Sequence, residues 1–384
     1  MTTSRIPGFY AKTIADRVAA LEAQGALRPD TAAFLVKGGG LELSVADTMS
    51  ENVIAVHGLP LSVALNFRVN GRDVLVPMAI EEPSVVAACS YAARLARHLG
   101  GFTGVATAAV MTAQVQLDQV AEPAAAKTRI EAAKAELIAL ASASVPRLCD
   151  RGGGARDLDV RVLDAAAGVL VVHIHVDVGE AMGANLVDTV AEAIAPRVLE
   201  LAGGRMGLRI LTNLPLQRRV KVTTEIAASE LGGVASADGI ARASRFAELD
   251  PFRAVTHNKG IMNGVDAVAV ALGQDWRAIE AAAHAYAAHE GTYKPLATWK
   301  LEAETLKGQI ELPLVIGTVG GSTQSHAGVR AAFELLGKVT TAELSCVIAA
   351  AGLAANLAAL RALAGEGIQK GHMRLHARKK GTQP

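Results

Sequence analysis

Two neighbouring acids, Glu81 and Glu82, stand before Pro83 and Ser84 at the start of a segment with helical spacing of apolar residues. The N-terminus of a helix stabilises a carboxylate, and burial beside a second acid raises a carboxyl pKa, so one of the pair could donate a proton near neutral pH. Capping of the helix would explain the same two residues. The pair is therefore a candidate general acid that needs support from other segments.

A second candidate is the segment 250–264, which contains His257, Asn258, Lys259 and Asn263. These polar groups interrupt a chain otherwise rich in alanine and valine. We predict a polar loop that places the Lys259 ammonium beside a reacting oxygen, where it would stabilise developing negative charge. A solvated loop with an incidental lysine is the alternative.

Two further segments have both a structural and a chemical explanation. Asp275 occupies the usual N-cap position of the next predicted helix, and capping is sufficient to explain it. Residues 177–185 join a predicted strand to a helix through small residues, which would let backbone N–H groups approach a phosphate at the helix N-terminus. A tight strand-to-helix connection needs the same small residues.

Three histidines are candidate functional groups. His372 lies in a glycine-punctuated segment, residues 365–373, and could protonate a leaving thiolate, although most single histidines are structural or exposed. His173 and His175 share one face of a predicted strand, but no third ligand has a recognisable spacing, so we expect a solvated sheet face and no metal site.

The elements that must position these groups follow from apolar spacing and turn residues. Asn70-Gly71 between alternating segments predicts a β-hairpin over 59–80, and Pro83 predicts the first turn of a helix that runs to His98. Strands and helices then alternate between residues 109 and 212, which indicates a compact α/β insert. The further predicted elements are a helix pair over 11–37, helices over 124–140, 184–201, 236–248, 274–289 and 341–364, and strands over 109–120, 158–178, 205–212 and 219–226.

Composition excludes several classes of protein. Apolar residues make up 51% of the 384 residues and aromatic residues only 3%, which predicts a core of small aliphatic side chains and argues against disorder. Lys and Arg total 38 against 37 for Asp and Glu, so no net field would attract nucleic acid or an anionic membrane. The chain lacks G-x-G-x-x-G and Walker patterns, so neither a standard Rossmann domain nor a P-loop is supported.

The cysteines and the apolar stretches indicate the cellular compartment of the protein. The three cysteines form no C-x-x-C pair, which argues against a disulfide framework and a zinc site and fits a reducing cytoplasm. The N-terminus lacks a signal-peptide pattern, and no uncharged apolar stretch reaches the roughly 18 residues that span a bilayer. We expect a cytoplasmic protein with no membrane partner.

Taken together and in order, these segments resemble one family, the 3-hydroxy-3-methylglutaryl-coenzyme A (HMG-CoA) reductases, and within it the bacterial-type class II enzymes. The resemblance covers nearly the whole chain. It rests on Glu51-Asn52-Val53-Ile54, Asn70-Gly71-Arg72-Asp73-Val74-Leu75-Val76-Pro77, Glu81-Glu82-Pro83-Ser84, Met182-Gly183-Ala184-Asn185, His257-Asn258-Lys259-Gly260-Ile261-Met262-Asn263-Gly264, Asn356-Leu357 and Gly371-His372-Met373.

The resemblance implies an NAD(P)-dependent oxidoreductase of the mevalonate pathway of isoprenoid metabolism. Such an enzyme interconverts HMG-CoA and mevalonate plus CoA by two hydride transfers, via bound hemithioacetal and mevaldehyde. The implied catalytic set is Glu82, Lys259, Asp275 and His372. Lys259 would stabilise the oxyanion and Glu82 would supply protons as the hemithioacetal collapses and in the second reduction. Asp275 would hold Lys259 and Glu82 in one hydrogen-bond network, and His372 would protonate the departing CoA thiolate.

The resemblance also assigns binding residues. Ser84, Arg253 and Asn263 match family positions that hold the hydroxymethylglutaryl or CoA portion of the substrate. The nucleotide site is matched by Met182, Gly183, Ala184 and Asn185.

The implied fold class is α/β (α+β), a large helix-rich domain with an inserted small α/β non-Rossmann nucleotide-binding domain. Residues 1–108 and 215–374 would form the large domain for substrate binding and dimerisation, and residues 109–214 the small NAD(P)-binding domain. Family members are homodimers or higher even oligomers with active sites at the subunit interface, which residues 51–54 help to build.

Residues 142–147 depart from NADH-using relatives, which carry there an acid that would bind the ribose 2′-hydroxyl. This chain has no acid in the segment, and Arg147 with the nearby serines would suit a 2′-phosphate. The departure predicts a preference for NADPH over NADH. A milder departure is Glu180, which stands where the motif of the family has Asp. The negative charge is the same in both residues.

Residues 375–384 match the start of a C-terminal flap that relatives carry in full, so the flap is expected to be truncated, unresolved or absent here. If it is absent, closure and thiolate protonation would suffer while hydride transfer survives. Two alternatives stay open. Another CoA-thioester or nicotinamide oxidoreductase could share the scaffold, and a catalytically impaired family member could act as a dimeric assembly partner.

Overall fold

The computed structural model of the chain describes residues 2–321 and 325–365. The chain divides into two compact units. The large unit comprises Met1–Ala106, Val220–Leu312 and Gly320–Pro384, and the small unit comprises Thr107–Arg219 and Pro313–Val319. Each unit has its own sheet and its own buried apolar interior.

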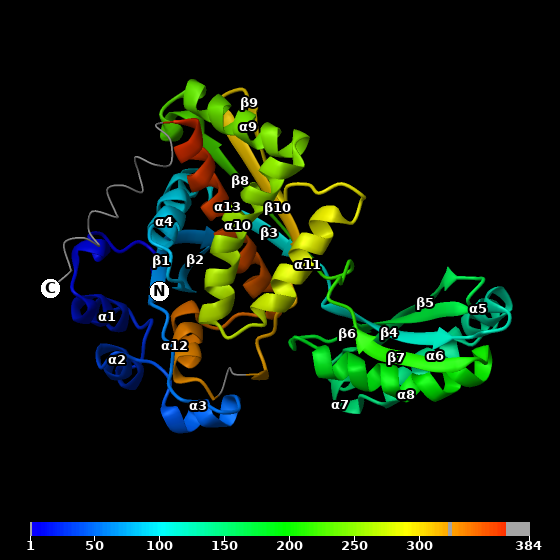
Figure 1. The fold of residues 1–384 in the computed structure, drawn as a ribbon. Helices are drawn as coiled ribbons and strands as arrows, with labels where there is room; N and C mark the ends of the chain where they lie inside the picture. The colour runs from blue at the N-terminus through cyan, green and yellow to red at the C-terminus, as the bar shows by residue number, and fades with distance from the viewer. Residues whose placement is uncertain (1, 322–324, 366–384) are drawn as a thin grey trace. The chain divides into compact units, whose positions relative to one another are not determined.

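A six-stranded sheet runs through the large unit in the order β2-β1-β3-β8-β10-β9 (Figure 1). Its strands are β1 (Leu61–Val69), β2 (Arg72–Ala79), β3 (Phe102–Ala106), β8 (Arg219–Ala227), β9 (Ala297–Glu302) and β10 (Thr305–Pro313). The helices are α1 (Ile14–Ala23), α2 (Pro29–Val36), α3 (Leu43–Met49), α4 (Val85–Ala96), α9 (Val234–Leu249), α10 (Pro251–Ala271), α11 (Trp276–Ala288), α12 (Ala327–Leu336) and α13 (Thr341–Ala364), with short 3-10 turns at Phe9–Ala11, Arg97–Leu99 and Ala228–Leu231.

β1 and β2 form the predicted hairpin. Val69 pairs with Arg72 across the turn, and Asn70 and Gly71 both have positive φ, 49° and 78°, as a two-residue hairpin turn of this kind requires. The Asn70 side chain also bonds the backbone of Gly104 in both directions, at 3.0 and 2.8 Å. The turn therefore ties the hairpin to the next strand of the sheet.

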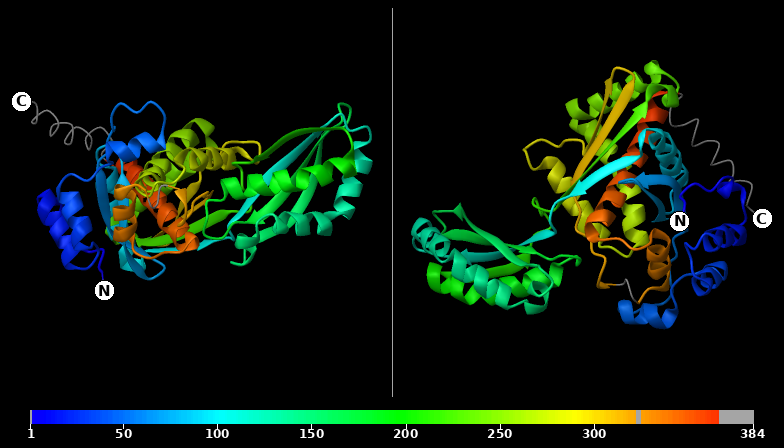
Figure 2. Two further views of the ribbon diagram at one scale, coloured as in Figure 1. Left: turned by 90° about the horizontal axis from the view of Figure 1, so that it is seen from below. Right: turned by 180° about the vertical axis from the view of Figure 1, so that it is seen from behind.

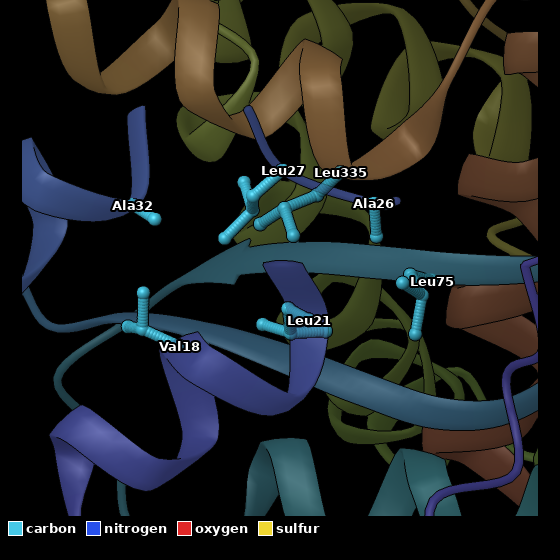
Figure 3. Packing of buried hydrophobic residues seen from close by; sticks show 7 residues of the cluster. All are labelled: Val18, Leu21, Ala26, Leu27, Ala32, Leu75 and Leu335. Carbon is cyan, nitrogen blue, oxygen red and sulfur yellow. The ribbon is translucent and has the colours of Figure 1, made fainter. Parts of the chain in front are cut away.

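The β1–β2 hairpin is covered on one side by helices from distant parts of the sequence. Val18 and Leu21 of α1, Leu75 of β2 and Leu335 of α12 are all buried and form one cluster (Figure 3). The Thr31 hydroxyl of α2 adds a hydrogen bond of 2.7 Å to a carboxylate of α12. The predicted N-terminal helix pair is thus packed against the sheet.

Helix α13 is the core helix of the large unit, and α10, α4 and α9 pack against it. α10 and α13 approach closely because each has glycine at the contact. A Cβ on Gly264 would lie 2.4 Å from the Ala351 carbonyl oxygen, and one on Gly352 would lie 2.8 Å from a Val265 methyl. α13 is long and apolar enough to cross a membrane by length and composition, but 72% of its most apolar window is buried inside the protein, as in the core helix of a soluble protein.

The small unit is a four-stranded sheet in the order β5-β6-β4-β7, and the described strand pairs are all antiparallel. Its elements are β4 (Val110–Asp118), α5 (Pro123–Ala132), α6 (Lys134–Ala143), α7 (Pro146–Cys149), β5 (Gly154–Asp164), β6 (Val169–Asp177), α8 (Ala184–Ala202) and β7 (Arg205–Leu211). α5, α6 and α8 pack against the sheet (Figure 2). This arrangement differs from the parallel sheet of a Rossmann domain.

The segment 250–264 is not the loop that its polarity predicts, because it forms much of helix α10. Asp250 caps the helix by accepting hydrogen bonds from the backbone N–H groups of Phe252 and Arg253. His257 and Asn258, which suggested a solvated loop, are 1% and 0% exposed. Burial of polar side chains that bond to distant parts of the chain, and not solvation, explains the polarity of the segment.

Three element boundaries also differ from the prediction. The helix expected over 124–140 is two helices, α5 and α6, separated at Ala133, and the strand expected over 158–178 is the β5–β6 hairpin. Pro83 precedes α4, which begins at Val85, so it does not occupy the first turn.

The expectation of a solvated face at His173 and His175 is wrong for His175, which is 7% exposed. Its ring nitrogens lie 2.9 Å from the Thr112 hydroxyl and 2.7 Å from an Asp159 carboxylate oxygen. These neighbours on β4 and β5 replace water around the imidazole. Among the described residues, no group of three or more His, Cys, Asp or Glu side chains is arranged to hold a metal ion.

Candidate active site

Glu82 and Lys259 lie side by side in the large unit, although they are far apart in the sequence. Lys259 Nζ donates a hydrogen bond to Glu82 Oε2 at 2.9 Å. Glu82 belongs to the connection between β2 and α4, and the two side chains are 63% (Lys259) and 36% (Glu82) exposed. Solvent screens an ion pair this exposed, so the pair adds little to the stability of the fold. It does place an ammonium and a carboxylate within reach of one bound molecule.

His257 and Asn258, which precede Lys259 in the sequence, fix the rotation of α10 about its axis. Asn258 donates to the Lys294 carbonyl and accepts from the Leu296 N–H, both at 2.9 Å. His257 Nε2 lies 3.0 Å from the Ala297 carbonyl oxygen. Burial lowers the pKa of His257 to about 4, so its ring is neutral at physiological pH. These contacts hold one side of the helix to the segment that leads into β9 and to the first residue of β9, and they leave Lys259 facing outward.

Ser84 lies next to Glu82 in a strained part of the chain. Its φ is 82°, a left-handed conformation that costs energy for a residue with a Cβ. The Ser84 hydroxyl oxygen is buried and has no hydrogen-bond partner in the described structure. A buried polar atom without a partner is costly, and this hydroxyl is free to hydrogen-bond to a bound molecule.

Arg253 and Asn263 belong to the same helix as Lys259. Asn263 follows Lys259 by one turn and therefore shares its face of α10. Arg253 lies in the first turn, half-buried, and burial lowers the pKa of its guanidinium. The helix thus carries a cation in its first turn and a cation and an amide further along.

Asp275 is separate from this pair within one chain. Its carboxylate caps α11 by accepting from the Ala278 N–H at 3.1 Å. The Gln274 N–H bonds to the Ala269 carbonyl, so Asp275 follows directly on the end of α10. Ala269 is ten residues beyond Lys259, which is about 15 Å along a helix axis. The structure therefore brings together Glu82 and Lys259 but not Asp275 in a single chain.

The predicted nucleotide residues form the turn from β6 into α8 in the small unit. Gly183 has φ 106°, and a Cβ there would lie 2.7 Å from a Val178 methyl, so glycine is required. No side chain caps the N-terminus of α8, and Asn185 in its first turn is exposed. Arg147 is also exposed, on the short helix α7. His372 and residues 375–384 lie outside the described residues.

A carboxyl pair between α10 and α11 is not among the residues predicted from the sequence. Asp266 lies two turns beyond Lys259, and burial together with the neighbouring Glu280 raises the pKa of Asp266 to about 8. The hydrogen bond of 2.7 Å from His284 lowers the pKa of Glu280. Asp266 therefore keeps its proton at neutral pH. The pair comes from two helices, and no local pattern in the sequence predicts that they meet.

Replacing Asp266 by asparagine is expected to flatten the pH dependence of stability. The folded pKa of Asp266 is above the unfolded value of about 3.9, so the folded state binds an extra proton and its advantage is lost as pH rises from about 4 to about 8. Asp266→Asn mimics the neutral form and should be more stable than the natural chain at pH 8, by about 1 kcal/mol or more. Urea unfolding at pH 5, 6.5 and 8 measures this. Parallel pH profiles for the two proteins would show that Asp266 is ionised in the fold.

Comparison with known proteins bears on the whole chain. A family model described as hydroxymethylglutaryl-coenzyme A reductase matches residues 13–377. The 3-hydroxy-3-methylglutaryl-coenzyme A reductase of Archaeoglobus fulgidus is 47% identical over 378 residues, which cover 98% of this chain and 86% of the relative.

Solved structures agree with the sequence relatives. A class II 3-hydroxy-3-methylglutaryl-CoA reductase from Streptococcus pneumoniae, bound to NADPH in open conformations, is 44% identical with a TM-score of 0.90, over 93% of this chain and 99% of that one. A second structure of the reductase from Streptococcus pneumoniae has 44% identity and a TM-score of 0.92, over 97% and 90% of the two chains.

Proposed function

The chain belongs to the hydroxymethylglutaryl-coenzyme A reductase family of NAD(P)H-dependent oxidoreductases, and on this basis we propose that it interconverts HMG-CoA and mevalonate plus CoA through Glu82 and Lys259. The observation that carries this assignment of residues is the contact of 2.9 Å between the Lys259 ammonium and the Glu82 carboxylate. Thioester reduction needs a cation where negative charge develops on oxygen and a group that handles protons beside it. The pair supplies both at one place.

In the proposed mechanism, Lys259 binds the thioester carbonyl oxygen and stabilises the oxyanion of the hemithioacetal. The nicotinamide, when bound, supplies the two hydrides. As the carbon–sulfur bond breaks, His372 protonates the CoA thiolate and the carbonyl of mevaldehyde re-forms. Lys259 then polarises this aldehyde, and Glu82 delivers the second proton to the alkoxide, which gives mevalonate. Two hydrides and two protons are thus consumed for each thioester reduced.

Substrate binding is proposed for Ser84, Arg253 and Asn263. The unpartnered hydroxyl of Ser84 supports a hydrogen bond to the substrate beside Glu82. The guanidinium of Arg253 is suited to a carboxylate or phosphate of HMG-CoA because its planar donors can bind two oxygens at once. Asn263, on the Lys259 face of α10, would bind a neutral oxygen of the same molecule.

The nucleotide is proposed to bind at Met182, Gly183, Ala184 and Asn185 in the small unit. The compact glycine turn and the uncapped N-terminus of α8 are suited to a pyrophosphate, which accepts hydrogen bonds from backbone N–H groups. A preference for NADPH is proposed from Arg147, whose exposed guanidinium would pair with the 2′-phosphate.

Replacing Arg147 by alanine is expected to raise the KM for NADPH by about tenfold or more and to leave the KM for NADH unchanged. A hydrogen bond to a charged group contributes about 1.5 kcal/mol or more, and NADH lacks the phosphate that would receive it. Steady-state kinetics with both nucleotides measure the effect. Arg151→Ala is the matched control, since Arg151 is exposed on the turn that follows α7. A loss that is equal for both nucleotides would contradict the proposal.

A cytoplasmic homodimer whose active sites combine two copies is also proposed. Ile54, in the segment expected at the interface, is 96% exposed in the single chain, and Tyr10 and Phe252 are 87% and 88% exposed. A second copy that covered these side chains would remove them from water. It could also bring Asp275 to Lys259, which the course of α10 and α11 prevents within one chain.

The direct test mixes the purified protein with mevalonate, CoA and each oxidised nucleotide, and follows the absorbance of the reduced nicotinamide. Two equivalents of nucleotide reduced for each CoA thiol consumed are expected. Another ratio would indicate a different nicotinamide oxidoreductase on this scaffold. A dimer without turnover would indicate an impaired assembly partner.

A further inference from the structure

Arg218 is a buried cation beneath the turn from β6 into α8. Its side chain lies in the segment before β8 and is almost completely enclosed, with 4% of the residue exposed. Nη1 donates to the Met182 carbonyl oxygen at 2.7 Å, and Nη2 donates to the Ala181 carbonyl at 3.3 Å and to the Ile316 carbonyl. One guanidinium therefore holds two successive carbonyls of the turn and one carbonyl of a remote segment.

The charge of Arg218 is compensated locally. Burial lowers the pKa of its guanidinium to about 10, while the carboxylates of Asp177 and Glu180 act in the opposite direction. Arg218 is therefore still a cation at neutral pH. An enclosed charge is tolerated only where hydrogen bonds and opposite charges replace water, and the carbonyls of the turn do so here.

The remote segment holds the same turn from a second direction. The Thr318 backbone N–H bonds to the Glu180 carbonyl at 2.9 Å, and the Thr318 hydroxyl donates to the Glu180 carboxylate at 2.8 Å. Ala181 forms an isolated parallel bridge with Val319. A Cβ on Gly317 would lie 2.5 Å from the Met182 nitrogen, so this segment packs directly against the turn.

We infer that Arg218 is a positioning residue for nucleotide binding, and that with Thr318 it forms a clamp that fixes the backbone of Glu180–Gly183 before the nucleotide arrives. In a planar trans peptide, the carbonyl of one residue and the N–H of the next point in opposite directions. Because Arg218 binds the Met182 carbonyl, the Gly183 N–H points away from Arg218. A pre-set backbone avoids the entropy cost of ordering the turn on binding.

This inference rests on the proposed nucleotide site, and it predicts a selective effect. Arg218→Gln removes the charge and cannot hold all three carbonyls, so the KM for NADPH should rise by about tenfold, with kcat within about threefold of the natural value and the KM for HMG-CoA unchanged. Arg218→Lys keeps the charge but not the planar set of donors, so an intermediate rise is expected. A purely structural role would instead lower the amount of active protein and leave the KM for NADPH unchanged.

A second variant covers the case in which the Arg218 variants do not fold. Thr318→Val removes one hydroxyl bond and leaves the buried cation in place, so it should raise the KM for NADPH by about threefold. Thr223→Val on the exposed side of β8 is the matched control and should have no effect. Unchanged nucleotide KM in Thr318→Val and in whichever Arg218 variants fold would overturn the inference.

Titration of NADPH fluorescence separates this inference from the proposed function. If the natural protein binds NADPH but does not turn over, the proposed activity fails, and weaker binding by Arg218→Gln or Thr318→Val still supports the clamp. If the natural protein turns over and the variants bind NADPH equally well, the clamp fails and the activity stands. Absence of binding of both NADPH and NADH by the natural protein would overturn both.

Discussion

Replacing Lys259 by alanine is expected to lower kcat for HMG-CoA reduction by about 10³-fold or more. Removal of one oxyanion donor costs about 10²- to 10³-fold in other enzymes, and here the donor also carries the positive charge next to Glu82. The fold should not suffer, because the Lys259 side chain is 63% exposed and its ion pair adds little stability. Steady-state kinetics and thermal unfolding of the same preparation measure the two effects.

Two comparisons make this prediction specific. Lys300→Ala removes an exposed lysine from β9 and should leave kcat unchanged. Glu82→Gln should lower kcat less than Lys259→Ala does. The double variant should have a kcat only slightly below that of the lysine variant, because substitutions of residues that act as a unit do not have additive effects. Retention of a tenth or more of the natural kcat by Lys259→Ala would remove the lysine from the chemistry.

Local signals in the sequence predicted much of the fold. Asn70-Gly71 fixed the position and type of the β1–β2 turn because those two residues tolerate positive φ. The apolar stripe of residues 184–201 predicted α8 to within one residue of its observed end, Ala202. Asp275 was correctly expected to cap α11. Each of these features depends on neighbours a few residues away.

The predictions that failed depend on contacts between distant residues. His257 and Asn258 suggested a solvated loop because their partners, the backbone of residues 294–297, lie about 40 positions further along the chain. His175 suggested a wet sheet face because Thr112 and Asp159 come from other strands. Polarity in a sequence does not distinguish an exposed side chain that bonds to water from a buried one that bonds to other parts of the protein.

The same limit applies to the site. Local patterns make Glu82, Lys259 and Asp275 candidates and the resemblance groups them into one catalytic set, but spacing alone does not show which of them meet. Arg218 is adjacent to Arg219 in the sequence, and nothing local predicts that Arg218 is enclosed by three carbonyls. Asp266 reads as an ordinary polar residue of a helix until Glu280 is placed beside it. Such groups are defined by packing between elements.

Asp275→Asn is expected to abolish most of the activity while it preserves the fold. Asparagine caps a helix about as well as aspartate, so the bond to the Ala278 N–H and the start of α11 should be kept. Lys259 and Glu82 should lose their negatively charged partner across the proposed interface, at a cost of about 10²-fold in kcat. An unchanged kcat would show that Asp275 acts only as the N-cap of α11.

Heterodimers then decide whether Asp275 acts on its own chain or on the partner. Lys259→Ala and Asp275→Asn chains are coexpressed with different tags, and the doubly tagged dimer is isolated. If Asp275 acts across the interface, one of the two sites in this dimer contains both natural residues, so about half the natural activity should return although each variant alone is inactive. If Asp275 acts within its own chain, both sites carry a defect and no activity returns. Because Asp275 follows the end of α10 about 15 Å beyond Lys259, we expect the activity to return.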